Sequence, residues 1–191
     1  PTSSLILKLF IQDLEKQYKS KVISLNLRDK QKGWKQMFLS AHFGNNKQFT
    51  QLYYETSMGR AFIEHAIRPS CYDCKFKGFP RFGDCTLGDF WSKERNGNLY
   101  NKNGTSVIIG NSSKGDELIK MASDRMVLYP TDLAVIIKGN PKLIKSVRYP
   151  KNRNKFWEVL KKQDLKVAVL KYCNPSLIEK TTKKIIRRIG I

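Results

Sequence analysis

Two cysteines separated by two residues, Cys71 and Cys74, are the side chains whose type and spacing most directly suggest chemistry in this sequence. A short turn between two thiolates can aim both sulfur atoms at one metal ion or cluster. The same spacing occurs in redox dithiols and in ordinary cysteine pairs, so the motif alone is ambiguous. A disulfide is not expected in a reducing cytoplasm. A redox dithiol is not favoured either, because this pair lies in a loop of Gly, Pro and Lys residues and not at the start of a helix.

The other cysteines do not complete a metal site by their spacing. Cys85 lies eleven residues beyond Cys74, and Cys173 is distant in the sequence and has no second cysteine beside it. A zinc ribbon would need a second C-x2-C pair, which the sequence lacks. The chain therefore presents two good ligands and one candidate third ligand, Cys85. Either a metal or cluster site is incomplete here, or the cysteines are structural.

Basic residues and glycines surround the C-x2-C pair. Lys75, Lys77 and Arg81 would favour the thiolate form and offset the negative charge of a thiolate-bound cluster. The backbone N–H groups of Gly78 and Gly83 are candidates for hydrogen bonds to cluster sulfur atoms. These features favour a functional thiolate site.

The two histidines are expected to be structural. His42 follows the apolar face of an expected strand, and His65 lies near the end of an expected helix. No Ser/His/Asp arrangement, HExxH motif or pair of carboxylates stands out, so a hydrolase is poorly supported.

Hydrophobic periodicity predicts that helices and strands alternate along the chain. Helices are expected at residues 4–19, 57–66, 131–137, 154–162 and 174–188, with another ending at Met121; strands are expected at residues 22–27, 36–43, 51–54, 85–91 and 107–109. In the first strand, Ile23, Leu25 and Leu27 are expected to share one face. This order predicts an α/β or α+β fold with a mixed sheet flanked by helices. One domain is expected over residues 1–150, with the cysteine loop at 69–91, and a basic helical tail over 151–191 packed on it.

The sequence carries a formal charge of +20, from 36 Lys and Arg residues against 16 Asp and Glu residues. Such an excess favours polyanionic partners. Residues 151–191 contain twelve basic and three acidic residues, and the rest of the excess is spread along the chain. We interpret this charge as a solvated basic surface; the alternative is that it attracts an acidic redox partner or an anionic cofactor. Nucleic acid is the least expected partner.

No apolar run approaches the roughly 18 residues of a membrane span, and no signal peptide is recognisable. A cytoplasmic location is therefore expected. The sequence begins at Pro1 without an initiator Met, from which we expect a piece of a longer protein.

A longer tract around the cysteines supports a more specific interpretation. Residues 68–76 are Arg-Pro-Ser-Cys-Tyr-Asp-Cys-Lys-Phe, and residues 84–91 are Asp-Cys-Thr-Leu-Gly-Asp-Phe-Trp. Together they closely resemble the C-terminal domain of the coenzyme F420 hydrogenase/dehydrogenase beta-subunit family. Weaker matches are spread over nearly the whole chain and comprise Ser4-Leu5 with Phe10, Arg28-Asp29-Lys30, Gly33-Trp34, Gly104-Thr105-Ser106, Gly139-Asn140-Pro141 and Arg153 to Phe156.

The resemblance implies a flavoprotein that passes electrons between iron–sulfur clusters and a deazaflavin or another organic acceptor. Cys71 and Cys74 would hold a 4Fe–4S cluster together with cysteines of a ferredoxin-like region upstream of this domain. Cys85 stands where relatives usually have an aliphatic residue, which leaves its role as a ligand open. Gly88 and Asp89 are motif positions for cofactor binding, and FAD is expected in the full-length protein.

We therefore expect residues 1–150 to be the redox domain of an iron–sulfur, flavin-dependent oxidoreductase, inactive as an isolated piece. Its electron partner would be an organic acceptor or an acidic carrier such as ferredoxin. The alternative is a non-enzymatic, zinc-stapled basic module that binds nucleic acid or anionic surfaces. Zinc in the isolated piece would not decide between them, since zinc also occupies a vacated thiolate site.

Overall fold

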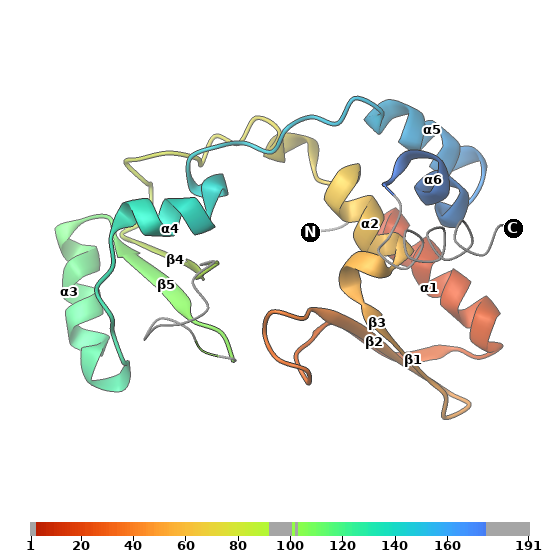
Figure 1. Cartoon of the computed structure of the whole chain (residues 1–191), viewed down its shortest axis with the longest axis horizontal. Coiled ribbons are helices and arrows are strands. Elements are labelled where there is room, and N and C mark those ends of the chain that lie inside the picture. The colour runs from red at the N-terminus through yellow and green to blue at the C-terminus, as the bar shows by residue number, and fades with distance from the viewer. Residues whose placement is uncertain (1–2, 92–100, 102, 175–191) are drawn as a thin grey trace, which may run out of the picture. The chain divides into compact units, whose positions relative to one another are not determined.

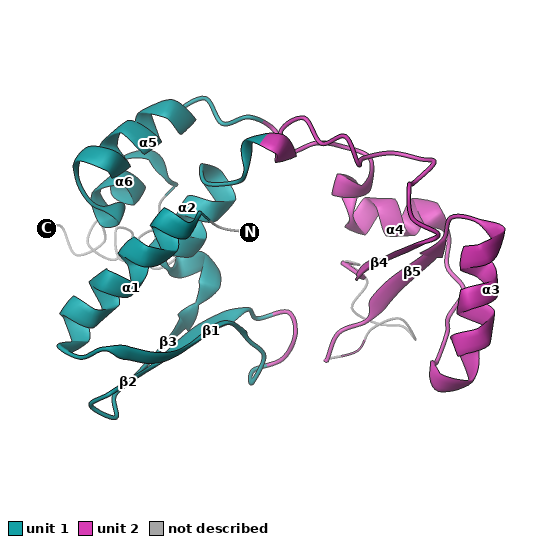
Figure 2. Ribbon diagram, turned by 180° about the vertical axis from the view of Figure 1, so that it is seen from behind, with its two compact units in different colours: residues 1–32, 36–69, 149–191 teal, residues 33–35, 70–148 magenta. Residues whose placement is uncertain are grey.

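The computed structural model describes residues 3–91, 101 and 103–174 of the chain. Its contacts divide the chain into two compact units (Figure 2). Unit 1 consists of residues 1–32, 36–69 and 149–191, and unit 2 consists of residues 33–35 and 70–148. Unit 2 is thus inserted between two segments of unit 1.

Among its described residues, unit 1 combines a three-stranded antiparallel sheet, in the order β1-β2-β3, with four helices (Figure 1). The strands are β1 (Val22–Asp29), β2 (Phe38–Phe43) and β3 (Gln48–Leu52), and the helices are α1 (Ser4–Tyr18), α2 (Ser57–Glu64), α5 (Arg153–Lys162) and α6 (Leu165–Tyr172). Helix α1 contacts α2, α6 and β1, while α5 packs on α6. The N-terminal and C-terminal segments of the chain therefore build one core together.

The core of unit 1 contains apolar side chains from all of these helices and from β2. Helix α1 buries Ile6, Phe10 and Leu14, which recur every four residues and so lie on one face. Strand β2 buries Leu39, Ala41 and Phe43, the alternation that the sequence predicts. The buried apolar side chains of the other three helices are Met58, Ala61, Phe156, Leu160, Leu165, Ala168 and Val169.

Strand β1 departs from the predicted alternation. Its pairing with β2 shifts register twice, between Val22 and Ser24 and between Asn26 and Asp29. Each irregularity changes which side chains face the core. As a result Leu25 packs against the core while Ile23 is 70% exposed. The prediction that Ile23, Leu25 and Leu27 share one face is wrong, because Ile23 is exposed where Leu25 packs on the core.

Unit 2 is built around a two-stranded antiparallel ribbon of β4 (Cys85–Asp89) and β5 (Ser106–Gly110). Helix α3 (Ser113–Ala122) follows β5 directly, with the Ser112 side chain capping its N-terminus by accepting from the Gly115 N–H. Helix α4 (Leu133–Gly139) contributes Ile136 to a small core with Phe90 and Val107. Short 3-10 turns lie at Tyr53–Glu55, Pro69–Cys71, Ser123–Arg125 and Pro141–Leu143.

The predicted class, a mixture of helices and strands with a helical C-terminal region, is confirmed. The strands form two antiparallel sheets. Each helix predicted before residue 163 is present, and α6 was not predicted. The helix predicted at 174–188 lies almost entirely outside the described residues, and Asn174 itself is not helical. The assignment of residues 1–150 to a redox domain and of 151–191 to a tail stays a prediction.

None of the described helices combines the length and apolar character that a bilayer crossing requires.

Candidate functional site

The loop that carries Cys71 and Cys74 is held by the segment that follows α4. The Cys71 carbonyl oxygen accepts a hydrogen bond from the Val147 N–H at 3.1 Å. The Cys74 N–H donates to the Ser146 hydroxyl oxygen at 3.1 Å. Both cysteines are partly buried and are free thiols. The backbone at each cysteine is therefore anchored to one short segment, while the sulfur atoms are left for other partners.

Gly78 contributes to the same anchoring. Its N–H donates to the Leu143 carbonyl oxygen at 2.7 Å, and its φ of +89° lies in the region that favours glycine. This N–H is therefore occupied by the backbone, and the prediction that it bonds a cluster sulfur is wrong. Gly83 lies outside this anchoring; its carbonyl oxygen accepts from the Asn111 side chain at 2.8 Å.

The positive charge beside the thiols is shared with a carboxylate. Lys75 lies 2.7 Å and Lys77 lies 3.8 Å from oxygens of Asp73, which separates the two cysteines in sequence. The hydrogen bond and charge of Lys75 lower the pKa of Asp73 from its ordinary value, and Asp73 in turn raises the pKa of Lys75. The Lys77 amine also donates to the Cys74 carbonyl oxygen at 3.1 Å. Part of the predicted charge is thus paired within the loop itself.

Cys85 lies on β4 opposite Gly110 and faces the start of α3. Its thiol donates to the Gly115 carbonyl oxygen at 3.5 Å. A Cβ at Gly115 would lie 3.3 Å from the Cys85 sulfur, so the helix start is packed closely on this side chain. Within the described part of the chain, Cys71, Cys74 and Cys85 do not gather into a group of three ligands.

The two motif positions named for a cofactor are neighbours on β4. Gly88 pairs with Val107 and is exposed, and a Cβ there would meet no described atom within 4 Å. Asp89 pairs with Ser106 and is partly buried. Among the described residues, nothing therefore blocks the close approach of another molecule to Gly88.

Exposed aromatic rings lie beside the cysteine loop. Phe76 and Phe82 are 70% and 86% exposed and make an edge-to-face pair with ring centroids 5.8 Å apart. They line a shallow cavity of about 280 Å³ with Arg81 and Cys85. Two adjacent exposed rings form a small apolar patch, which suits contact with another part of the protein or with a partner.

Three pieces of the family-like sequence meet at Trp34. Its ring lies 4.3 Å from the ring of Trp91, which ends the tract at residues 84–91. Gly104 has a φ of +99°, and a Cβ there would lie 2.7 Å from Trp34 atoms. Trp34 is 5% exposed. A glycine is thus required at position 104 for two reasons, the positive φ of its backbone and the indole ring of Trp34 packed against it.

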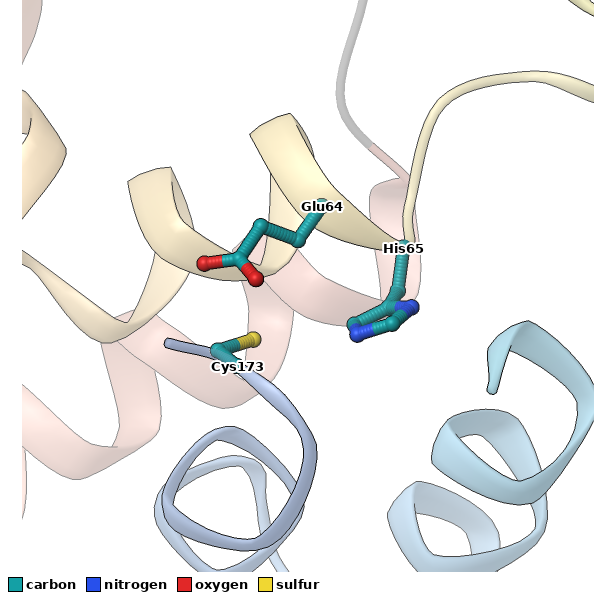
Figure 3. Close-up of side chains that lie close together, drawn as sticks. All are labelled: Glu64, His65 and Cys173. Carbon is teal, nitrogen blue, oxygen red and sulfur yellow. The ribbon is translucent and has the colours of Figure 1, made fainter. Parts of the chain in front are cut away.

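A second group of possible ligands lies in unit 1 and was not predicted. Glu64, His65 and Cys173 each offer one donor atom, and these atoms lie within 4.8 Å of one another (Figure 3). His65 and Cys173 are buried, and Glu64 is half-buried. The other histidine, His42, is exposed on β2. In the sequence, only the adjacent residues Glu64 and His65 could have indicated this group, because Cys173 is remote from them along the chain.

A comparison with protein-family models finds a match over most of the residues that carry the sequence motifs. Residues 3–134 match the family model that describes the C terminus of the beta subunit in coenzyme F420 hydrogenase/dehydrogenase. No curated protein and no solved structure is detectably similar to the chain. The match includes the cysteine loop, the β4 tract and Trp34, and it covers most of the sequence. The chain therefore belongs to the coenzyme F420 hydrogenase/dehydrogenase beta-subunit family, of which it carries the C-terminal domain.

Proposed function

We propose that this domain is part of an iron–sulfur, flavin-dependent oxidoreductase in which Cys71 and Cys74 are two of the four thiolate ligands of a 4Fe–4S cluster. The supporting observation is the anchored loop, in which the backbone of both cysteines is bonded to Ser146 and Val147. A site whose ligands are positioned by such contacts loses less conformational entropy on binding. Thiolates are the usual ligands of such a cluster, and Cys71 and Cys74 would supply two of the four.

The bound cluster would supply one-electron chemistry. The task of this chain is to position two thiolates and to moderate their charge. Lys75 and Lys77 place positive charge in the loop, where both pair with Asp73. We do not assign Cys85 as a ligand, because its thiol already bonds to the Gly115 carbonyl.

The remaining ligands would come from a ferredoxin-like region upstream in the same protein, since the family domain is a C-terminal one. Gly88 and Asp89 remain our candidates for contact with FAD, because Gly88 leaves open space over β4. The charge of +20 supports an acidic electron carrier as partner, and such an attraction is screened by salt.

The test is anaerobic purification of the full-length protein, with iron, sulfide and flavin measured for each variant. We expect Cys71→Ser and Cys74→Ser each to lose a cluster of about four irons and its visible absorption. Cys85→Ser and Cys173→Ser serve as matched thiol controls, and both should retain the cluster.

A colourless protein with stoichiometric zinc on Cys71 and Cys74 would overturn this proposal in favour of the zinc-stapled module. Loss of the cluster in Cys85→Ser but not in Cys71→Ser would show that the wrong thiols are assigned. Flavin released on denaturation, measured by fluorescence, tests the cofactor separately.

A further inference from the structure

The group of Glu64, His65 and Cys173 joins the ends of two helices. Glu64 is the last residue of α2, His65 follows it, and Cys173 follows the last residue of α6. Figure 3 shows the Cys173 thiol facing the Glu64 carboxylate and the His65 ring. The donor atoms lie within 4.8 Å of one another, with His65 5% and Cys173 7% exposed. A sulfur, a nitrogen and an oxygen donor thus converge at the edge of the core.

Neighbouring groups orient these donors. The Glu64 carboxylate accepts from the Asn174 backbone N–H at 3.0 Å and from its side-chain amide at 2.8 Å. The His65 ring stacks on Phe156, with centroids 5.0 Å apart and 21° between the planes. The Trp157 indole N–H donates to the His65 carbonyl oxygen at 3.3 Å. Ligands of metal ions are characteristically held by such contacts from the residues around them.

The His65 ring has a donor atom that its hydrogen bonds do not use. Nε2 lies 3.0 Å from the Tyr172 carbonyl oxygen, to which it donates in the neutral ring. Nδ1 is buried and has no hydrogen-bond partner among the described residues. Burying a polar atom without a partner is costly, and a metal ion bound by the ring removes part of that cost.

We propose that Glu64, His65 and Cys173 form a binding site for a divalent transition metal, with Zn²⁺ as the occupant that best suits the donors. Thiolate and imidazole ligands favour zinc over magnesium or calcium. Zinc bond lengths place neighbouring ligand atoms of a tetrahedron roughly 3.3–3.7 Å apart. The three donor atoms therefore need to move closer to one another by about 1 Å, which small side-chain rotations allow. The Tyr172 carbonyl oxygen stays with Nε2 on the other side of the ring, and a water completes the coordination.

The bound ion would connect segments that are remote in sequence. Glu64 and Asn174 are 110 residues apart, and all but three residues of unit 2 lie between them in the chain. A metal that binds only the folded arrangement stabilises it in proportion to its affinity and concentration. The site is separate from Cys71 and Cys74 and does not depend on the proposed function.

The test uses the 191-residue chain without a histidine tag and with Cys71→Ser and Cys74→Ser, so that the other thiol pair cannot bind the probe. The apo protein is titrated with Co²⁺ and with Zn²⁺. We expect one ion per chain, a sulfur-to-cobalt absorption band and a higher Tm. Asn174→Ala should weaken binding by about 10- to 100-fold, since it loosens the hold on Glu64.

Cys173→Ser should abolish the cobalt–sulfur band, and Glu64→Gln, which keeps a hydrogen-bond acceptor for Asn174, should weaken binding without unfolding the chain. Circular dichroism and the metal-free Tm establish that each variant is folded. The proposal fails if the background chain binds no ion at micromolar concentration. It also fails if the folded Glu64→Gln and Cys173→Ser variants bind the metal ion as tightly as their parent. The three residues would then serve only as a hydrogen-bonded contact between α2 and α6.

Discussion

At the scale of single residues, the packing of Trp34 on Gly104 decides what position 104 can accept. A side chain there would have to adopt a φ near the +99° of the glycine and would contact the indole at 2.7 Å. Both demands are met by glycine alone. Gly104, Trp34 and Trp91, whose ring packs against Trp34 at a tilt of 32°, thus form one contact although they are distant in sequence.

We predict that Gly104→Ala lowers the free energy of unfolding by roughly 2–3 kcal/mol, because it combines backbone strain with a clash. Gly78→Ala carries the strain without the clash, since a Cβ there meets no described atom within 4 Å, and should cost about 1–2 kcal/mol. Gly88→Ala carries neither and should change stability by less than about 0.5 kcal/mol. Urea unfolding measures all three. Equal costs for Gly104→Ala and Gly88→Ala would contradict the packing.

Asp29 makes the stability of unit 1 depend on acid pH. The Gln31 N–H, at 2.9 Å, and the Ser40 hydroxyl, at 2.7 Å, donate to its carboxylate and lower its pKa from the ordinary value. An ionised Asp29 therefore stabilises the fold above its unfolded pKa of about 3.9. That contribution disappears as the pH falls through the lower, folded-state pKa.

We expect Asp29→Asn to be less stable than the parent at neutral pH and less sensitive to acid below about pH 4. Thermal unfolding followed across the acid range gives both quantities. Ser40→Ala, which leaves the Gln31 bond in place, should show an intermediate effect. An unchanged pH dependence in Asp29→Asn would mean that other carboxylates account for acid unfolding.

At the scale of elements, strand β1 shows how irregular pairing overrides a simple alternation. Its two register shifts leave Ile23 exposed and turn Leu25 toward the core. Regular alternation would place Ile23 and Leu25 on the same face of the sheet. The paired strand β2 keeps its alternation through Leu39, Ala41 and Phe43, because the shifts fall on β1.

We predict that Leu25→Ala costs about 1–3 kcal/mol, since it removes apolar atoms that pack on the core. Ile23→Ala should lie within about 0.5 kcal/mol of the parent, because its side chain is mostly in solvent. Chemical unfolding of the two variants gives the difference. Comparable losses in both would mean that β1 pairs in the regular register after all.

At the scale of the whole molecule, the core of unit 1 needs residues beyond the family match. The match ends at residue 134, whereas α5 and α6 lie after it. These helices bury Phe156, Leu160, Leu165, Ala168 and Val169. The ends of the two unit 1 segments also meet, because the Arg153 guanidinium donates to the Ile67 carbonyl oxygen at 3.4 Å.

A chain that ends at residue 134 should therefore lack cooperative unfolding of unit 1, as followed by near-ultraviolet circular dichroism and calorimetry. Replacing residues 70–148 by a short Gly/Ser linker removes more of the chain, yet it should leave unit 1 folded, because the chain ends it joins are adjacent. If the truncated chain unfolds cooperatively and the linked chain does not, the division into these units is incorrect.

Much of the architecture could be predicted because it depends on local patterns. The apolar spacing of residues 4–19 predicts α1, and the alternation from Leu39 to Phe43 predicts β2. Helix α6 was missed because it is short and apolar around most of its circumference, although Asp164 caps it by accepting from the Val167 N–H at 2.8 Å. An Asp before an apolar run was the available signal.

The sequence by itself determined the family, the C-x2-C pair and the identity of most elements, since spacing within a few residues is enough for each. The tertiary structure decided that Gly78 bonds to Leu143 and that Cys173 lies beside His65. The first contact joins two segments of unit 2 that are 65 residues apart, and the second depends on how the chain returns to unit 1 after the whole of that insertion. Such pairings come from the packing of distant segments against one another, and no local pattern encodes which segments will meet.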